Sequence, residues 1–444
     1  MNKSALLRVL FFVVILSTGS HCFARGLDVN VQDVVTSQGN KYWHIQEDTL
    51  PMVAVTMAFK NSGSLYDPVS KKGLAALVSS VIARGTVAKD GESIAKKLQG
   101  RGVTLDVYAD GDNIYVSIKT LAENLDFALS AVGSSLIYAS IDEAVFNVEK
   151  EKQKADIRGS AMEPTVLASE MLDKIMFGDD PHAYPVQGTI PTVESIMLED
   201  VESYRRENFD LDKMVIGVTG NVSKEVLSDI LDRSFAGIPR GQNTKEIQSA
   251  HPKLGLRGYV KYSAPQSVIV FATKGVSYKD PKYHVAEVLN NALGGIGLSS
   301  VLMQELRQRM GITYNVSSSL RHGGGADLLQ GALFTDSTTA KEGVKALLKT
   351  INSVKEKGLD EKSFKIAKAD LINSFVFAFL KRSSVAAELV QLQLRGLGVD
   401  YIRNYSSIYD SVTLRDVNEF AKDFFGDFTI VEVGSRNNIG ASIT

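Results

Sequence analysis

Apolar residues recur with helical spacing between positions 74 and 82, at i, i+3, i+4, i+7 and i+8. They are Leu74, Leu77, Val78, Val81 and Ile82. This spacing places them on one face of an amphipathic helix, whose apolar side is expected to face a core. The opposite face carries three small residues, Ala76, Ser79 and Ser80.

Short apolar and β-branched runs predict strands elsewhere in the chain. They cover residues 52–59, 214–218, 268–271 and 429–433. Long helical patterns lie between them, and one of these is predicted to start near Ser140, where Glu143 completes a capping box. This mixture of strands and helices is typical of an α+β fold in which helices pack on sheets.

Three landmarks recur at nearly one spacing along the chain. Residues 140–146 match 359–364 at an offset of 218, residues 198–204 match 414–420 at 216, and residues 67–68 match 280–281 at 213. Each match is short, so coincidence is the alternative, but a common offset indicates two homologous halves. The predicted domains are residues 25–240 and 252–444, joined by the polar stretch between them.

The first 24 residues have the pattern of a secretory signal peptide. Lys3 and Arg8 flank the start of an apolar run at 9–16, and small residues precede a cleavage site after Ala24. An uncleaved anchor is the alternative, although the run is shorter than the roughly 20 residues that a membrane span needs. The expected location is therefore the periplasm, without a stable membrane anchor.

Composition narrows the possible functions of the remaining chain. Removing residues 1–24 from 444 leaves 420 residues and removes Cys22, the single cysteine, so disulfides and thiol catalysis are excluded together. The whole chain has 49 basic and 51 acidic residues, a balance that gives no electrostatic reason to bind nucleic acid or anionic membranes. A length of 420 residues is more than one core normally serves, so at least two domains are expected.

The helix at 74–82 carries a resemblance to a known family. Residues 73–86 resemble the metal-binding helix of the insulinase, pitrilysin and mitochondrial processing peptidase family, whose inverted zinc motif H-x-x-E-H falls on Ala76, Ser79 and Ser80. Residues 177–189 and 198–220 resemble later segments of the family's first domain. The resemblance implies two tandem homologous α+β domains, each an antiparallel-rich sheet packed with helices.

The residues at the motif positions argue against zinc chemistry in this chain. A zinc peptidase uses imidazoles to hold the ion and a carboxylate to activate water, and methyl or hydroxyl groups supply neither function. Alignment places Asp156 at the third ligand position and Glu149 seven residues before it, but a lone carboxylate without imidazoles binds zinc poorly, and the alternating charges favour a solvated helix face. No pair of histidines has ligand spacing, which leaves only a site built from distant residues as an alternative. We expect no cofactor in this chain, with zinc only in a partner subunit.

A second motif resembles the family's other contribution to its active site. Residues 306–314 resemble the second-domain segment in which the family places an Arg and a Tyr seven positions apart, here Arg307 and Tyr314. In active members this pair reaches the scissile peptide. The alternative is that neither residue has a functional role, Arg307 being an exposed charge on a helix and Tyr314 a half-buried residue of a strand. The glycines at 294–297 are expected to form a turn into a helix at 299–310, and those at 323–325 a hairpin or strand-edge kink.

These observations predict a non-catalytic subunit of a periplasmic zinc-peptidase heterodimer. The partner would carry an intact H-x-x-E-H motif, while this chain supplies Arg307 and Tyr314 and binds extended peptide at a sheet edge. A peptide-binding or scaffold protein that works without a protease is the alternative, and weak metallopeptidase activity of the chain alone is the third possibility. Nucleic acid is not an expected partner.

Overall fold

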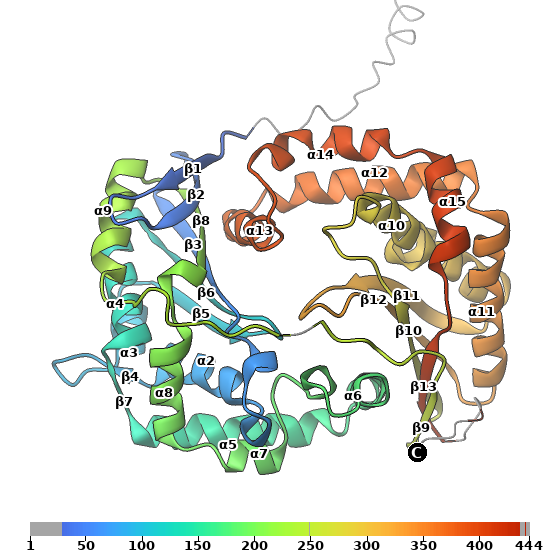
Figure 1. Ribbon diagram of the computed structural model, residues 1–444, viewed down its shortest axis with the longest axis horizontal. Helices are drawn as coiled ribbons and strands as arrows, with labels where there is room; N and C mark the ends of the chain where they lie inside the picture. The colour runs from blue at the N-terminus through green and yellow to red at the C-terminus, as the bar shows by residue number, and fades with distance from the viewer. Residues whose placement is uncertain (1–28, 248, 436–439, 441–444) are drawn as a thin grey trace, which may run out of the picture.

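The computed structural model describes residues 29–247, 249–435 and 440, and these form two lobes, each built on one sheet (Figure 1). The predicted signal peptide at 1–24 lies outside the described residues. Within the described ranges, no helix is long and apolar enough to cross a membrane.

The first lobe contains a six-stranded sheet in the order β1-β2-β8-β3-β6-β5. Its strands are β1 (Gln32–Val35), β2 (Lys41–Gln46), β3 (Met52–Lys60), β5 (Thr104–Ala109), β6 (Asn113–Leu121) and β8 (Met214–Gly220). A small separate sheet pairs β4 (Thr86–Val87) with β7 (Ser140–Ile141). Its helices are α2 (Leu74–Arg84), α3 (Ile94–Gly100), α4 (Leu125–Ile137), α5 (Glu143–Ser160), α7 (Ile190–Glu194), α8 (Leu198–Asn208) and α9 (Lys224–Phe235).

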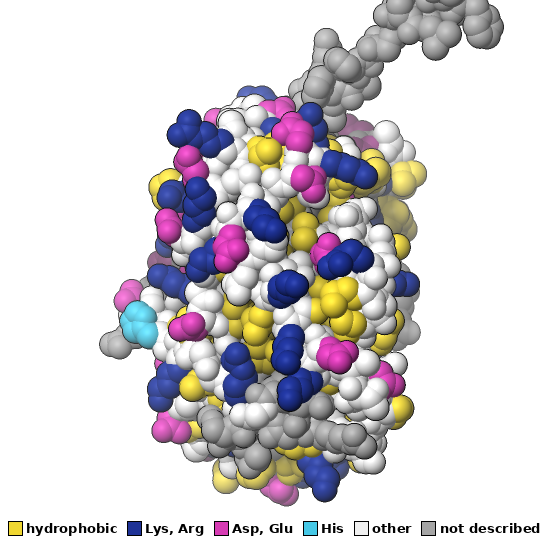
Figure 2. Space-filling model, turned by 90° about the vertical axis from the view of Figure 1, so that its right-hand side faces the viewer, with side chains coloured by type: hydrophobic (Ala, Val, Ile, Leu, Met, Phe, Trp, Pro, Cys, Tyr) yellow, Lys and Arg dark blue, Asp and Glu magenta, His cyan; other side chains and the backbone are white. Residues whose placement is uncertain are grey.

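The second lobe contains a five-stranded sheet in the order β11-β12-β10-β13-β9. Its strands are β9 (Arg257–Lys261), β10 (Gln266–Lys274), β11 (Thr313–Arg321), β12 (Leu328–Asp336) and β13 (Thr429–Gly434). The α-helices around it are α10 (Tyr283–Asn290), α11 (Ala340–Lys357), α12 (Glu361–Ala378), α14 (Asp400–Ser411) and α15 (Leu414–Phe424). Charged side chains of both signs are interspersed over its outer face (Figure 2), in keeping with the near-neutral composition.

Five strands of each sheet follow the same order and direction. The order β2-β8-β3-β6-β5 repeats as β9-β13-β10-β12-β11, and in each sheet the first pair is parallel and the other three pairs are antiparallel. Two tandem homologous α+β domains are thereby confirmed. The domain limits at residues 240 and 252 stay predictions.

The helix predicted near Ser140 begins slightly later. Ser140 belongs to strand β7, and the N-cap of α5 is Asp142, whose carboxylate accepts the N–H groups of Ala144 (2.9 Å) and Val145 (3.2 Å). A carboxylate caps the first turn well, and it also sits favourably at the positive end of the helix dipole. Asp360 caps α12 in the second half in the same way, so the repeat holds although the predicted capping box was wrong.

The two halves exchange one helix each. The first half contributes α6 (Pro164–Phe177), which packs on β9, β10 and β13 of the second sheet. The second half contributes α13 (Arg382–Leu394), which packs on β3 and β8 of the first sheet. Figure 1 shows α6 beside the second lobe and α13 beside the first, although each helix belongs in sequence to the other half. Each sheet therefore buries one face under a helix from the other half, which couples the two lobes through their cores.

The glycines at 323–325 form the turn between β11 and β12, which confirms the predicted hairpin. All three have positive φ, from 55° to 150°, a region that glycine adopts without steric cost. The hairpin contacts the first lobe, since the N–H of Gly324 donates to Asp112 Oδ1 (2.7 Å). Arg321 beside it pairs with Asp173 (2.7 Å) on the exchanged helix α6. The hairpin is a third connection between the halves, besides the exchanged helices and the linker.

Candidate peptide-contact site

Helix α2 is held in place by buried polar residues at its N-terminus. Gly73 takes φ of 97° as N-cap, and the Asp67 carboxylate accepts the N–H groups of Gly73 and Ala75, each at 3.1 Å. Burial raises the pKa of Asp67 to about 7, against the opposing effects of Lys72 and the backbone donors. Lys72 is itself buried, donates to the carbonyl oxygens of Ser64 (3.0 Å) and Leu65 (3.3 Å), and has its pKa lowered by burial.

The three motif positions on α2 offer no metal ligands. Ala76 and Ser79 are buried, and Ser80 is half-buried. The Ser79 hydroxyl donates to the carbonyl oxygen of Ala75 (2.8 Å), so it is engaged within its own helix. Among the described residues, no group of three or more His, Cys, Asp or Glu side chains could hold a metal ion. A methyl and two hydroxyls do not fit zinc.

Helix α5 presents an amide rather than a carboxylate to the start of α2. Asp156 is exposed, whereas Glu149 is buried and lies 3.6 Å from Arg84. Between them, Gln153 is buried and its Nε2 donates to the carbonyl oxygens of Gly73 (3.0 Å) and Gln187 (2.8 Å). Sequence analysis missed Gln153, although its position four residues after Glu149 places it on the same helix face.

Arg307 lies on an unusual helix. The predicted helix at 299–310 exists, but after a short turn (η7, Gly297–Ser299) its main part is a π-helix, η8 (Met303–Arg309). The exposed guanidinium of Arg307 makes no hydrogen bond or ion pair with the rest of the described chain, whereas Arg309 on the same helix pairs with Glu305. π-Helical turns are rare and are frequently found at functional sites.

Tyr314 lies on irregular backbone as well. The register of β11 against β12 shifts between Thr313 and Asn315, so Tyr314 is the unpaired residue of a β-bulge. Its side chain is 53 % exposed, and its ring centroid is 5.7 Å from that of Phe334. Bulges redirect a side chain and are over-represented beside active sites. The element carrying Arg307 packs directly on β11, and both side chains are exposed.

Each sheet also ends in an edge strand that is available for pairing. Among the described residues, β5 pairs only with β6, and β11 only with β12. Strand β5 packs against α2, the helix with the altered motif, and β11 carries Tyr314. An unpaired edge presents alternating N–H and C=O groups to which an extended peptide can add as another strand.

Comparison with known proteins identifies the origin of this architecture. The family described as "Insulinase (Peptidase family M16)" matches residues 45–190, and the related "Peptidase M16 inactive domain" matches residues 195–371. The chain belongs to the M16 family. Because the groups that would hold zinc and activate water are missing, it is a non-catalytic, peptidase-like member, as its sequence predicted.

Individual relatives agree with this assignment. The chain is 24% identical over 377 residues to the "Non-peptidase homolog YmxG" of Helicobacter pylori, covering 84% of this chain and 86% of that protein. Its fold is similar to an M16 inactive domain from Pseudomonas fluorescens, with TM-score 0.86, 22% identity and coverage of 92% and 98%. A chain of "Complex III2 from Candida albicans, Inz-5 bound" is also similar, with TM-score 0.77, 17% identity and coverage of 92% and 97%.

Proposed function

We propose that this M16 member is the non-catalytic subunit of a periplasmic zinc-peptidase heterodimer. A partner chain with an intact H-x-x-E-H motif supplies zinc and the general base, and this chain supplies Arg307 and Tyr314. The observation that carries the proposal is the contrast between the two sites. The motif positions on α2 are methyl and hydroxyl groups, while Arg307 and Tyr314 lie exposed on a π-helix and a β-bulge.

The chemistry of the pair suits a peptide bond under attack. A guanidinium donates charge-assisted hydrogen bonds to a peptide carbonyl, and a phenol donates to an oxygen that gains negative charge. Neither group needs a metal of its own. The substrate would be an extended peptide whose backbone pairs with an edge strand, which makes recognition depend on main-chain groups more than on side-chain identity.

The test uses the reconstituted heterodimer and two variants that remove one donor each. Arg307→Ala and Tyr314→Phe should leave assembly unchanged, because both side chains point away from the core. Turnover should fall about a hundredfold to a thousandfold, the effect of losing one preorganised donor, or roughly 3 to 4 kcal/mol. Arg309→Ala is the matched control, since Arg309 lies on the same helix but pairs with Glu305, and it should keep full activity.

Two results would contradict this function. Unchanged turnover in both variants would return Arg307 and Tyr314 to the role of ordinary surface residues. Purification of the chain from its native cell without any peptidase chain would favour the alternative, a peptide-binding or scaffold protein that works without a protease. The fold likeness to a chain of "Complex III2 from Candida albicans, Inz-5 bound" is compatible with that alternative.

A further inference from the structure

The two homologous lobes contain the same groove in two different states. In the first lobe the groove lies between helix α8 and the end of strand β3, and in the second between helix α15 and the end of strand β10. The repeat relates their walls: β3 and β10 both have nine residues and end at Lys60 and Lys274. Helices α8 and α15 correspond at an offset of 216, so Tyr204 matches Phe420.

The groove of the first lobe is filled by an extended segment of the chain's own linker. Asn243 Nδ2 donates to the carbonyl oxygen of Asn61 (3.1 Å), and Asn61 Nδ2 donates to the carbonyl oxygen of Lys245 (2.8 Å). The Lys245 ammonium donates to Asn208 Oδ1 (2.8 Å) and lies 5.8 Å from the centroid of the Tyr204 ring. Backbone, amide and cation–π contacts together hold this segment.

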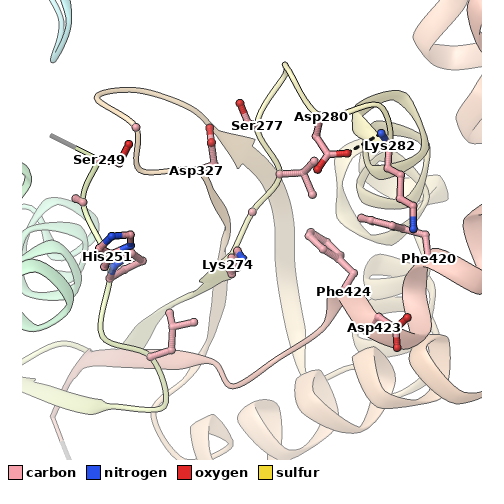
Figure 3. A pocket seen from close by; sticks show the side chains of 16 residues that line it. Ser249, His251, Lys274, Ser277, Asp280, Lys282, Asp327, Phe420, Asp423 and Phe424 are labelled. Atoms are coloured by element: carbon pink, nitrogen blue, oxygen red, sulfur yellow. Dashed lines mark hydrogen bonds between the residues drawn. The ribbon is translucent and has the colours of Figure 1, made fainter. Parts of the chain in front are cut away.

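The corresponding groove of the second lobe holds a cavity of about 650 Å³ instead (Figure 3). It is lined on one side by Phe420 and Phe424 and on the other by linker residues that include His251. The cavity floor is the end of β10, where Gly275 follows Lys274 as Asn61 follows Lys60 in the first lobe. Among the described residues, no group donates a hydrogen bond to the carbonyl oxygen of Gly275.

The helix wall of the second groove is aromatic where that of the first is polar, while charged side chains, among them Asp280, Lys282 and Asp423, also line the cavity. Asn208, which accepts from Lys245 in the first lobe, is matched by Phe424, and the two Phe rings at 420 and 424 stack with centroids 4.8 Å apart. Asn61, which donates to the linker, is matched by Gly275, which has no side chain. The second groove therefore has a carbonyl group, that of Gly275, after its strand as the first has that of Asn61, but offers an aromatic surface where the first offers the amide of Asn208.

We propose that this second groove binds an extended segment of another polypeptide, with an apolar or aromatic side chain against Phe420 and Phe424 and an N–H donated to the carbonyl oxygen of Gly275. A peptide is the ligand because the homologous groove is filled by one, which is held through the side chains of Asn243 and Lys245 and the carbonyl oxygen of Lys245. The change from Asn208 to Phe424 sets the preference for an apolar side chain over a lysine. The groove is separate from Arg307 and Tyr314, and the proposal stands without the proposed function.

The experiment uses two fluorescein-labelled peptides based on residues 241–247. One has the chain's own sequence and the other carries K245F, which matches the aromatic walls. Fluorescence anisotropy should show the K245F peptide binding to the wild-type chain at least tenfold more tightly. Neither peptide should displace the internal linker from the first lobe, because that segment is covalently attached and so has a high effective concentration.

A double variant converts the chemistry of the second groove to that of the first. Phe420→Tyr with Phe424→Asn should reverse the preference, so that the peptide with Lys binds more tightly than K245F. Phe377→Ala is the control, since Phe377 is 67 % exposed and lies outside the cavity, and it should bind as wild type. A photoreactive benzoylphenylalanine at position 245 of the peptide should cross-link within residues 420–424, which tests the site without any variant.

Four outcomes would overturn the proposal. The first is no binding of either peptide at 1 mM by the wild-type chain, and the second is a cross-link that maps outside the cavity. The third is binding that appears only after removal of residues 435–444, which would assign the groove to the chain's own tail. The fourth is a dimer of this chain that Phe424→Asn dissociates, which would assign the groove to a second copy.

Discussion

The exchange of helices between the lobes rests on a close backbone approach that a single methyl group would disturb. Gly217 in β8 faces α13, and a Cβ at this position would lie 2.4 Å from the carbonyl oxygen of Ala386 and 2.8 Å from Leu389 Cβ. The φ of Gly217 is not positive, so alanine can adopt the same backbone conformation. The effect of Gly217→Ala is therefore steric only.

The size of the destabilisation by Gly217→Ala follows from the distance by which α13 must move away from the sheet. A Cβ and a carbonyl oxygen rarely approach closer than about 3.2 Å, so α13 must move from the sheet by roughly 0.8 Å, and Leu389, which is fully buried, moves with it. Overpacking of this kind costs about 1–3 kcal/mol. Replacing glycine within a strand returns roughly 0.5–1 kcal/mol. The net expectation is a destabilisation of about 1 kcal/mol.

The assay is equilibrium unfolding in urea combined with amide hydrogen exchange. Gly217→Ala should lower the unfolding midpoint and increase exchange across residues 382–394, because α13 loses contact with the first sheet. Gly258→Ala is the matched control under α6. There the nearest atoms are Val431 Cγ2 (3.1 Å) and Ile175 Cδ1 (3.2 Å), side-chain ends that can rotate. A midpoint for Gly217→Ala equal to that of Gly258→Ala, with unchanged exchange in α13, would refute this account.

Three further results are expected. Metal analysis of the purified chain should find no stoichiometric zinc, and one tightly held equivalent would contradict the assignment of Ala76, Ser79 and Ser80. Burial lowers the pKa of His44 from 6.5 to about 4. The unfolded chain therefore binds a proton at this histidine before the folded chain does, and the free energy of unfolding falls by about 3 kcal/mol as pH drops from 6.5 to 4. His44→Leu should flatten the pH dependence of urea midpoints in that range. Gly324→Ala should weaken the contact between the lobes, because its Cβ would lie 2.3 Å from His182 Nε2 at φ of 55°; limited proteolysis of the β11–β12 hairpin should speed up.

Much of the fold could be predicted because its signals are local or repeated. The apolar spacing of α2 and the offset of about 216 residues both survive in the structure. The destination of α6 and α13 could not be predicted, since the pattern of a helix reports that it buries a face but not which sheet it covers. The N-cap of α5 was missed for a similar reason: Ser140 and Glu143 have capping-box spacing, but pairing of β7 with β4 removes Ser140 from the helix.

The candidate site could also be predicted only in part. The loss of metal ligands at Ala76, Ser79 and Ser80 follows from residue identity alone, whereas the π-helix under Arg307 and the bulge at Tyr314 depend on tertiary packing. No local sequence rule indicates a seven-residue π-helix, because it competes with an α-helix of almost the same composition. The sequence therefore identified these residues as candidates, and the structure adds the backbone irregularity that separates them from ordinary surface positions.

The arrangement around α2 explains how such a chain can lose zinc chemistry and keep its fold. The residues that fix the helix are Asp67, Lys72 and Gln153, all buried and all hydrogen-bonded. None of them is a motif position. Removing any one of these side chains would leave a buried group without its hydrogen-bond partner and lower the free energy of unfolding by about 1–3 kcal/mol. The side chains of Ala76 and Ser80 contribute no hydrogen bond to this network. The side chains that hold α2 in place are therefore different from those at its motif positions, so the motif can lack zinc ligands while the helix keeps its position in the fold.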